Sequence, residues 1–278
     1  MDLGDFKLYS LSDGAFRLDG GAVFGIVPKT LWEKTNEPDE LNRIALGINP
    51  LLIMTGADNI LVDTGIGDKW DDRSRSIYAI DRTATLTGSL AGAGLKPSDI
   101  TVVINTHLHF DHAGGNTFIG PEGALRPAFP NARHIVQRGE WEAANAPNER
   151  TRASYRQDDF LPVMKEGLLE LVEGDREVVT GVSVFRTSGH NRDIQLVRIS
   201  SGGSSAVYLS DIIPTVAHLR YPYIMGYDLF PLDTLRAKKE ILERASRERS
   251  LLVFGHDPAA SMGFVRIEED VPVFEKVS

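Results

Sequence analysis

One short segment of this 278-residue chain, His107-Leu108-His109-Phe110-Asp111-His112, constrains the protein more than any other feature of its sequence. Three imidazoles and a carboxylate within six residues have little use in core packing, but these are the side chains that bind transition metals. In extended chain, residues two apart point the same way, so His107 and His109 can bind one ion together. Asp111 and His112 come where the chain turns, and we expect them to face a second ion nearby.

Three further metal-binding side chains also follow apolar runs that are typical of buried strands. His107 follows residues 100–104, His190 follows 182–185, Asp211 follows 206–209 and His256 follows 251–254. Because neighbouring strands gather such ends at one edge of a sheet, we expect all four groups to meet there, where ligands commonly bind in α/β folds. A lone histidine is more often a satisfied polar residue than a ligand. Here, however, five of the seven histidines in the chain lie at such ends, and this concentration indicates a metal site.

The sequence contains no cysteine, so nitrogen and oxygen must hold any metal. Imidazole and carboxylate suit zinc, iron, manganese or cobalt. A carboxylate such as that of Asp211 can give one oxygen to each of two ions, and ions roughly 3.5–4 Å apart would share and acidify a water molecule. Gly114 and Gly115 follow the first cluster and permit a tight approach of the backbone.

The rest of the chain alternates short apolar runs with helical stretches. Residues 51–62 predict a hairpin, 86–95 a short helix closed by Gly94, 138–167 a polar stretch of helical composition, and 234–249 the clearest helix. This alternation predicts a layered α/β fold in which helices cover two sheets, and we expect one domain over residues 1–278.

Charge and hydropathy narrow the class of partner. The net charge of -9 disfavours an extended phosphate-binding surface, so we expect no nucleic acid. No apolar run approaches the roughly 20 residues of a membrane helix, and the acidic N-terminus does not resemble a signal peptide. We therefore expect a small-molecule substrate, no membrane partner and a cytoplasmic location; a homodimer is left open.

Several motifs together resemble those of one enzyme family. Residues 105–116, Asn105-Thr106-His107-Leu108-His109-Phe110-Asp111-His112-Ala113-Gly114-Gly115-Asn116, are similar to the signature of the metallo-β-lactamase superfamily of hydrolases. Residues 61–65, 188–190, 209–211 and 254–257 resemble its other motifs in the expected order, and the resemblance spans about residues 45–260. It implies an αββα sandwich with the site at one edge of two mixed sheets. The phenylalanine in the signature and the chain length are similar to the acyl-homoserine lactonase and organophosphate-hydrolase branches.

The resemblance also implies a role for each side chain of the site. One ion is assigned to His107, His109 and His190, the other to Asp111, His112 and His256, with Asp211 bridging the two. Asp63, at the end of another apolar run, is expected either to orient ligand imidazoles, which we favour, or to cap a turn. His134, inside an expected strand, is expected to be structural.

The chemistry expected of such a site is hydrolysis. We expect two divalent ions, with zinc favoured over iron, manganese or cobalt, and a metal-bridging hydroxide that attacks a small lactone or ester. Asp111 could pass a proton to the leaving group, which makes Asp111 and Asp211 the catalytic carboxylates. The alternatives are phosphotriester or phosphodiester hydrolysis, redox chemistry at iron in the same fold, and a metal-binding module without catalysis.

Two places differ from the family pattern. Residues 189–194, Gly189-His190-Asn191-Arg192-Asp193-Ile194, lack the second histidine of many relatives, and Pro214 stands where lactonases carry a substrate-contacting tyrosine. The candidates to replace that tyrosine lie in the aromatic segment 214–230 and are His218, Tyr221, Tyr223 and Tyr227. The expected apolar pocket is formed by Phe24, Trp32, Tyr223 and Phe230. Residues 20–42 are interpreted as a lid or a dimer contact.

Overall fold

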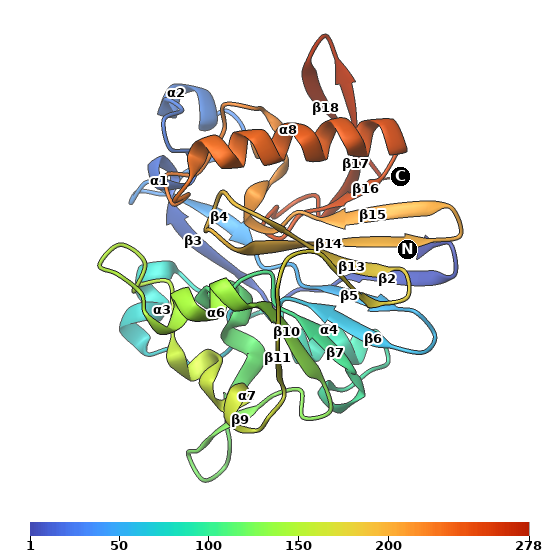
Figure 1. The fold of residues 1–278 in the computed structure, drawn as a ribbon. Helices are drawn as coiled ribbons and strands as arrows, with labels where there is room; N and C mark the ends of the chain where they lie inside the picture. Colours follow the sequence, from blue (N-terminus) through green and yellow to red (C-terminus); the bar gives the residue numbers. More distant parts are fainter. Residues whose placement is uncertain (278) are drawn as a thin grey trace.

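The computed structural model describes residues 1–277, and two seven-stranded sheets form its centre (Figure 1). The first sheet has the order β1 (Asp2–Leu3), β2 (Phe6–Ser10), β5 (Leu51–Met54), β6 (Asn59–Val62), β7 (Val102–Ile104), β10 (Arg133–Gln137) and β11 (Leu169–Val172). The second has the order β12 (Arg176–Val179), β13 (Val182–Thr187), β14 (Ile194–Ser201), β15 (Ser204–Tyr208), β16 (Leu251–Val253), β17 (Met262–Glu268) and β18 (Val271–Lys276).

Both sheets are mixed. In the first sheet β1, β2, β5 and β6 are joined by antiparallel pairing, whereas β6, β7, β10 and β11 run parallel. In the second sheet only β15 and β16 pair in parallel, among antiparallel neighbours. Two small ribbons complete the strands: β3 (Ala15–Asp19) with β4 (Arg43–Gly47), and β8 (Thr117–Ile119) with β9 (Leu125–Pro127).

The central strands are apolar on both faces because each face is covered. Along β7, Val102 and Ile104 point into the core that the two sheets share, while Val103 points to the outer face. Leu251 and Val253 of β16 alternate with Leu252 in the same way. The period of two in strand geometry therefore divides these unbroken apolar runs between an inner core and two outer layers.

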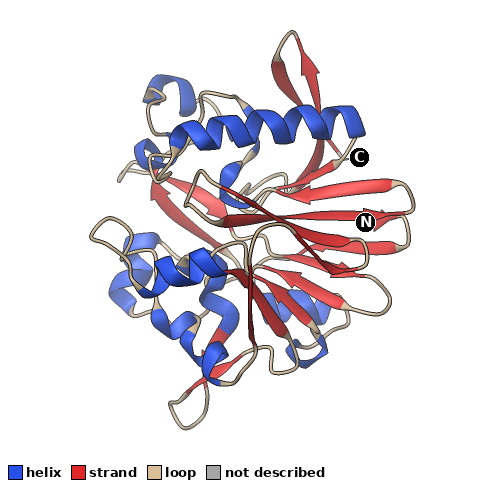
Figure 2. Ribbon diagram, in the orientation of Figure 1, coloured by secondary structure: helices blue, strands red, loops and turns tan. Residues whose placement is uncertain are grey.

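Helices form those outer layers (Figure 2). The α-helices are α1 (Gly20–Phe24), α2 (Lys29–Trp32), α3 (Asp72–Tyr78), α4 (Leu86–Gly92), α5 (Phe110–Ala113), α6 (Arg138–Asn145), α7 (Leu161–Lys165) and α8 (Pro231–Glu248). Single 3-10 turns lie at Pro97–Asp99, Gly114–Asn116, Gln157–Asp159, Ser210–Ile212 and Val216–Leu219. Helix α4 packs on the outer face of the first sheet through Leu86 and Leu90, and α8 packs on that of the second through Ala237, Leu242 and Ala245.

These layers confirm the predicted fold class, the hairpin of β5 with β6 and the helix α8. Within 138–167 helix is found only in α6 and α7, besides one 3-10 turn. Helix α6 ends before Pro147, which has no backbone N–H, and Asn148 Oδ1 accepts bonds from the backbone N–H of Arg150 and Thr151 in a turn. A single domain stays a prediction. No helix within residues 1–277 is both long and apolar enough to cross a membrane.

Candidate metal centre

The histidines and aspartates singled out in the sequence lie together at one end of the two sheets. His107 follows β7, Asp211 lies in the 3-10 turn after β15, and His256 follows β16. His190 follows β13, the antiparallel neighbour of β14. The parallel pairing of β15 with β16 brings the ends of those two strands, and so Asp211 and His256, to the same edge.

The first cluster is held in place by a very short helix. His109 precedes α5, which contains Asp111 and His112, and the next turn begins at Gly114. A Cβ atom on Gly114 would overlap the Ile66 carbonyl, and one on Gly115 would overlap the Thr64 carbonyl oxygen. The two glycines thus allow the close approach of backbone that the sequence suggested.

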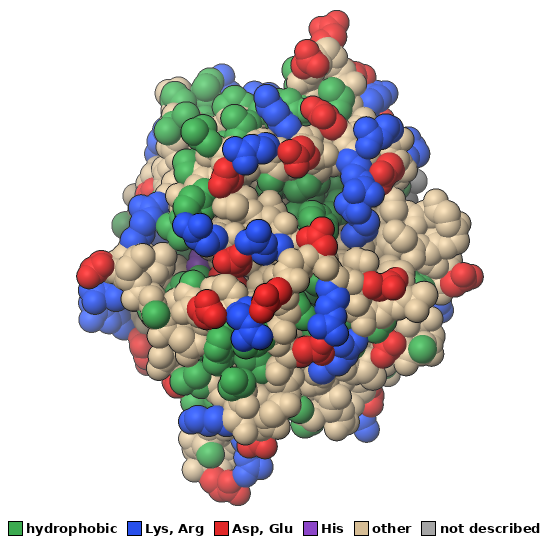
Figure 3. All heavy atoms as spheres, viewed as in Figure 1, with side chains coloured by type: hydrophobic (Ala, Val, Ile, Leu, Met, Phe, Trp, Pro, Cys, Tyr) green, Lys and Arg blue, Asp and Glu red, His purple; other side chains and the backbone are tan. Residues whose placement is uncertain are grey.

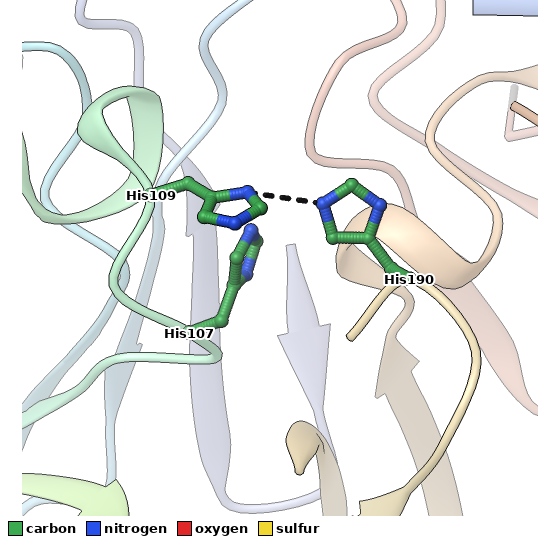
Figure 4. A group of neighbouring side chains, drawn as sticks. All are labelled: His107, His109 and His190. Carbon is green, nitrogen blue, oxygen red and sulfur yellow. Dashed lines mark hydrogen bonds between the residues drawn. The ribbon is translucent and has the colours of Figure 1, made fainter. Parts of the chain in front are cut away.

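Three groups of side chains have their ligand atoms within 4.8 Å of one another. We call His107, His109 and His190 the first trio (Figure 4), and Asp111, His112 and His256 the second trio. The third group, His107, His112 and Asp211, lies between them. Asp211 Oδ1 is 3.1 Å from Nε2 of both His112 and His256, and its Oδ2 is 3.3 Å from His190 Nε2. One oxygen of Asp211 therefore faces each trio.

The polar atoms at this centre fit metal ions better than they fit one another. Within the described residues, His107 Nε2 and Asp211 Oδ1 are buried without a hydrogen-bond partner. His190 Nε2 lies 3.1 Å from His109 Nδ1, and His256 Nε2 lies 3.0 Å from His112 Nε2. Because buried polar groups normally find partners, orphaned nitrogen and oxygen atoms that converge on one space are typical of a metal site.

Contacts made by the Nδ1 atoms, which face away from the centre, orient four of the imidazoles. His112 Nδ1 is 2.8 Å from Asp63 Oδ2, His190 Nδ1 is 3.0 Å from Asp228 Oδ1, His256 Nδ1 is 2.8 Å from the Gly47 carbonyl, and His107 Nδ1 is 3.0 Å from Thr106 Oγ1. Such contacts fix the ring and the tautomer, and they leave each Nε2 facing the centre. Asp63 also accepts a bond from the Thr106 backbone N–H, so it both orients an imidazole and holds the turn.

The surroundings of the centre shift the pKa values of its histidines in opposite directions. Burial lowers the pKa of His107 and His109 well below the usual value, with help from neighbouring imidazoles, so both are neutral, the state in which an imidazole can bind a metal. Burial also opposes a charge on His112, but the carboxylates of Asp211, Asp111 and Asp63 outweigh it and raise its pKa well above 6.5. Burial opposes a charge on Asp211 too; His112, His190 and His256 outweigh it and hold the pKa of this carboxyl well below 3.8.

Two residues at the centre have backbone conformations that are unusual for side chains with a Cβ. Asp63 has φ 57° and Ser210 has φ 44°, both in the left-handed region. Ser210 Oγ lies 2.8 Å from Thr106 Oγ1, which holds the turn that presents Asp211. Such backbone strain persists where surrounding contacts over-determine it, and it is concentrated at functional sites.

A cavity of about 440 Å³ opens over the centre, and histidine atoms are visible in a hollow left of centre in Figure 3. His109, Asp111, His190, Asp211 and His256 line it on the metal side. Its remaining wall is mainly apolar and includes Leu18, Ala22, Val23, Leu46, Phe110, Pro214, Met225 and Leu229. Tyr78, Tyr227, Arg150, Thr151 and Ser154 are its main polar groups away from the centre. The cavity has the size and character of a small-molecule site.

The substrate-contacting side chains suggested by the sequence need correction. Among the described residues, His218, Tyr221 and Tyr223 do not line this cavity. His218 is buried against Phe24, with Nδ1 2.8 Å from Thr215 Oγ1 and Nε2 3.1 Å from the Val23 carbonyl, and burial lowers its pKa to about 3. Tyr223 packs edge-on to Phe24. Of the four candidates, only Tyr227 faces the cavity.

The expected apolar pocket also has different walls. Phe24, Trp32 and Tyr223 pack into a hydrophobic cluster behind the cavity, where Phe24 stacks on Trp32 at 5.3 Å between ring centroids. Segment 20–42 therefore contributes Ala22 and Val23 to the cavity wall and places its aromatic residues in the core. The aromatic composition predicted that these rings line a pocket. In the fold the large rings are buried in the core behind Ala22 and Val23, because large apolar side chains are stabilised by burial.

Three residues at the site have roles that the sequence did not predict. Asp228 holds His190, Tyr78 lines the cavity, and Glu140 is fully buried beside the first trio. Each comes from a segment distant in sequence from the histidine motifs, and no spacing pattern links them. The unusual burial of a glutamate in a helix of mixed composition is visible only in the fold.

Comparison with known proteins agrees with this geometry. The model of the metallo-β-lactamase superfamily matches residues 43–256. An N-acyl homoserine lactonase of Bacillus cereus is 34% identical over 268 residues, covering 90% of this chain and 93% of the relative. A structure described as a probable metal-dependent hydrolase from Staphylococcus aureus has a TM-score of 0.91 at 32% identity, covering 100% of this chain and 99% of that one. An N-acyl homoserine lactone hydrolase with N-hexanoyl-L-homoserine at its catalytic metal centre has a TM-score of 0.69 at 28% identity, covering 93% and 95%.

The fold and the histidine-aspartate centre thus define the class of metal-dependent hydrolases built on two facing mixed sheets. The chain belongs to the metallo-β-lactamase superfamily. The family and the enzyme class predicted from the sequence are confirmed.

Proposed function

We propose that this protein is a dinuclear metal-dependent hydrolase that acts on a small lactone or ester with an apolar substituent. One observation carries the proposal: the two oxygens of Asp211 face two separate trios of ligand atoms at the floor of a mainly apolar cavity. N-acyl homoserine lactones are the first substrates to test, because the relatives are named for them.

The proposed ligands are divided as the two trios are. His107, His109 and His190 would hold one ion, and Asp111, His112 and His256 the other, with Asp211 between them. When bound, two divalent ions supply polarisation of the scissile carbonyl and an acidified water at neutral pH. We propose zinc, since a donor set of imidazole and carboxylate without sulfur suits it.

The protein's own residues would position the substrate and move protons. The mainly apolar wall, with Leu18, Val23 and Met225, would exclude water and hold an apolar chain. Asp111 lines the cavity and would pass a proton to the leaving oxygen. Since Pro214 offers no hydroxyl, Tyr78 and Tyr227 are proposed as the donors that orient the substrate carbonyl.

Both phenols remain protonated over the whole neutral range. Burial, followed by the charge of Asp111, raises the pKa of Tyr78, and burial with the charge of Asp19 raises the pKa of Tyr227 to about 12. A hydroxyl that keeps its proton is a hydrogen-bond donor to a carbonyl oxygen. The cytoplasmic location and the small-molecule partner stay predictions.

The experiment that tests this function is elemental analysis of protein purified without added metal, together with an activity panel. The panel includes N-acyl homoserine lactones of increasing chain length, simple lactones, carboxylic esters, a phosphotriester and a phosphodiester. Two ions per chain with lactone or ester hydrolysis would support the proposal. Iron with a visible absorption spectrum and no hydrolysis would favour redox chemistry, and a phosphotriester or phosphodiester as the best substrate would replace the lactone.

A further inference from the structure

A buried carboxylate beside the first trio has no part in the proposed reaction. Glu140 lies in α6 and is 0% exposed. Its Oε1 accepts a hydrogen bond from the Leu108 backbone N–H at 2.8 Å. Its Oε2 accepts bonds from Asn191 Nδ2 at 2.7 Å and from the Tyr155 hydroxyl at 3.3 Å. One side chain thus joins three segments that are far apart in the sequence.

Each of the three donors adjoins a histidine of the first trio. Leu108 stands between His107 and His109, and Asn191 directly follows His190. Tyr155 forms a β-bridge with His109, and their rings lie edge to face with centroids 4.8 Å apart. The bonds to Glu140 therefore hold the Leu108 backbone and the side chains of Asn191 and Tyr155 on both sides of the space that the first ion would occupy.

The segment after His190, where this chain departs from the family pattern, contacts Glu140 and its helix. Asn191 supplies the amide that bonds Glu140. Two residues later Asp193 packs so closely on α6 that a Cβ atom on Gly139 would collide with its carboxylate, which also pairs with Arg186 at 2.6 Å. The segment from Asn191 to Asp193 is thereby docked on the first turn of α6, and His190 is carried with it.

Keeping a carboxylate here is costly. Burial raises the pKa of Glu140 to about 7, although the Leu108 N–H and the Tyr155 hydroxyl oppose that shift. An apolar side chain would fill the space without this desolvation cost. The carboxylate therefore contributes through the hydrogen bonds that it accepts.

We propose that Glu140 is a positioning residue that, with Asn191, orders the first trio and so sets the affinity of this site for its ion. The inference rests on the proposed dinuclear function. Outer contacts of this kind change metal affinity by roughly 10- to 100-fold in other metal sites. Glu140 acts through the backbone of Leu108 and the side chains of Asn191 and Tyr155, and it does not need to contact the ion.

The test is a zinc titration of the metal-free protein against a chromophoric chelator, which yields two stepwise affinities. The variants are Glu140→Ala, Glu140→Gln, and Glu142→Ala as a matched control that is exposed on the same helix. We expect Glu140→Ala to weaken one affinity about 10- to 100-fold and to leave the other unchanged. Glu142→Ala should match the wild type in both.

Glu140→Gln should recover most of the lost affinity. The amide oxygen can still accept from Leu108, and the amide nitrogen can donate to Asn191 Oδ1, which has no partner among residues 1–277, once the Asn191 amide turns over. In a His190→Ala background, which lacks a ligand of the first trio, adding Glu140→Ala should not change the affinity of the remaining ion.

Three results would overturn the inference: both affinities weakened equally by Glu140→Ala, neither weakened, or Glu140→Gln as weak as Glu140→Ala. Failure of the proposed function would show in the wild type alone. A wild type that binds two ions but hydrolyses no lactone or ester would refute that function and leave the role of Glu140 standing. A wild type that binds fewer than two ions would refute both.

Discussion

At the residue scale, the same side chain behaves differently according to its neighbours. His107 and His112 are both buried, but only His112 faces three carboxylates, which raise its pKa while that of His107 is lowered. His134 is buried with neither carboxylate nor imidazole against it, and burial lowers its pKa to about 4. The pKa of a buried histidine is therefore raised only where carboxylates outweigh the effect of burial, as they do at His112.

Asp211 is the residue on which the proposed dinuclear site depends most. Asp211→Asn retains the shape of the side chain but removes the charge that faces His112, His190 and His256. We expect at least one ion to be lost and kcat/KM to fall by about 10²-fold or more. Elemental analysis and lactone hydrolysis measure both effects. A variant with two ions and full activity would refute the bridging role.

The tyrosines of the cavity wall can be tested one hydroxyl at a time. Tyr78→Phe and Tyr227→Phe each keep the ring and remove the donor, and we expect at least one to lower kcat/KM about 10- to 100-fold without loss of metal. Tyr9→Phe, in β2, serves as the control. If both single variants and the double variant keep full kcat/KM, neither phenol orients the substrate.

His134 predicts a pH dependence of stability. Its folded pKa of about 4 lies below the unfolded value near 6.5, so its contribution is present above pH 6.5 and is lost as the pH falls towards 4. Relative to His134→Leu, the metal-free wild type should lose roughly 2–3 kcal/mol in the free energy of unfolding between pH 7.5 and 4.5. Urea unfolding at the two pH values measures the difference. Equal pH dependence in both proteins would show that His134 titrates normally.

At the element scale, the site is built from short turns that are locked against one another. The turn of Gly114 and Gly115 that follows helix α5 packs on the turn after β6. There, Asp13 Oδ2 accepts bonds from the backbone N–H of Ile66 and Gly67. Such turns carry functional groups with precision only because the sheets behind them are rigid. Loss of close contact between two turns should therefore disturb metal binding before it disturbs the sheets.

Gly115→Ala tests that contact. The added methyl group would overlap the Thr64 carbonyl oxygen, so we expect a loss of about 1–3 kcal/mol in the free energy of unfolding and weaker metal binding. Gly92→Ala is the matched control, since a Cβ atom there meets nothing within 4 Å at the end of α4. Denaturant unfolding measures the stability of both variants, and elemental analysis measures their metal content. A Gly115→Ala protein as stable as Gly92→Ala would show that the turns can separate freely.

At the scale of the whole molecule, the centre joins the two halves of the fold. The first trio takes two histidines from the chain after β7 in one sheet and one from the chain after β13 in the other. Asp211 and His256 come from the second sheet and face His112 from the first. Bound ions would therefore tie the two sheets together at one edge.

Removal of metal should consequently lower the stability of the entire fold. An ion at a hundred times its Kd contributes about 2.7 kcal/mol, so chelation of two ions should lower Tm by roughly 10–20 °C. Differential scanning calorimetry with and without chelator measures the shift, and zinc restored to the chelated protein is the control. An unchanged Tm would show that no ion binds preferentially to the native state.

The sequence by itself determined the layered fold and the family, and it identified the histidines and aspartates that the structure brings together at one edge of the sheets. This was possible because strand periodicity and the H-x-H-x-D-H spacing are local patterns, readable within a few residues of one another. Only the tertiary structure decided which aromatic residues line the cavity, why Tyr227 faces it while Tyr223 packs behind it, and that Glu140 and Asp228 support the trio. Those outcomes depend on burial and on contacts between segments that are distant in the sequence. Both are determined only when the whole chain is closely packed.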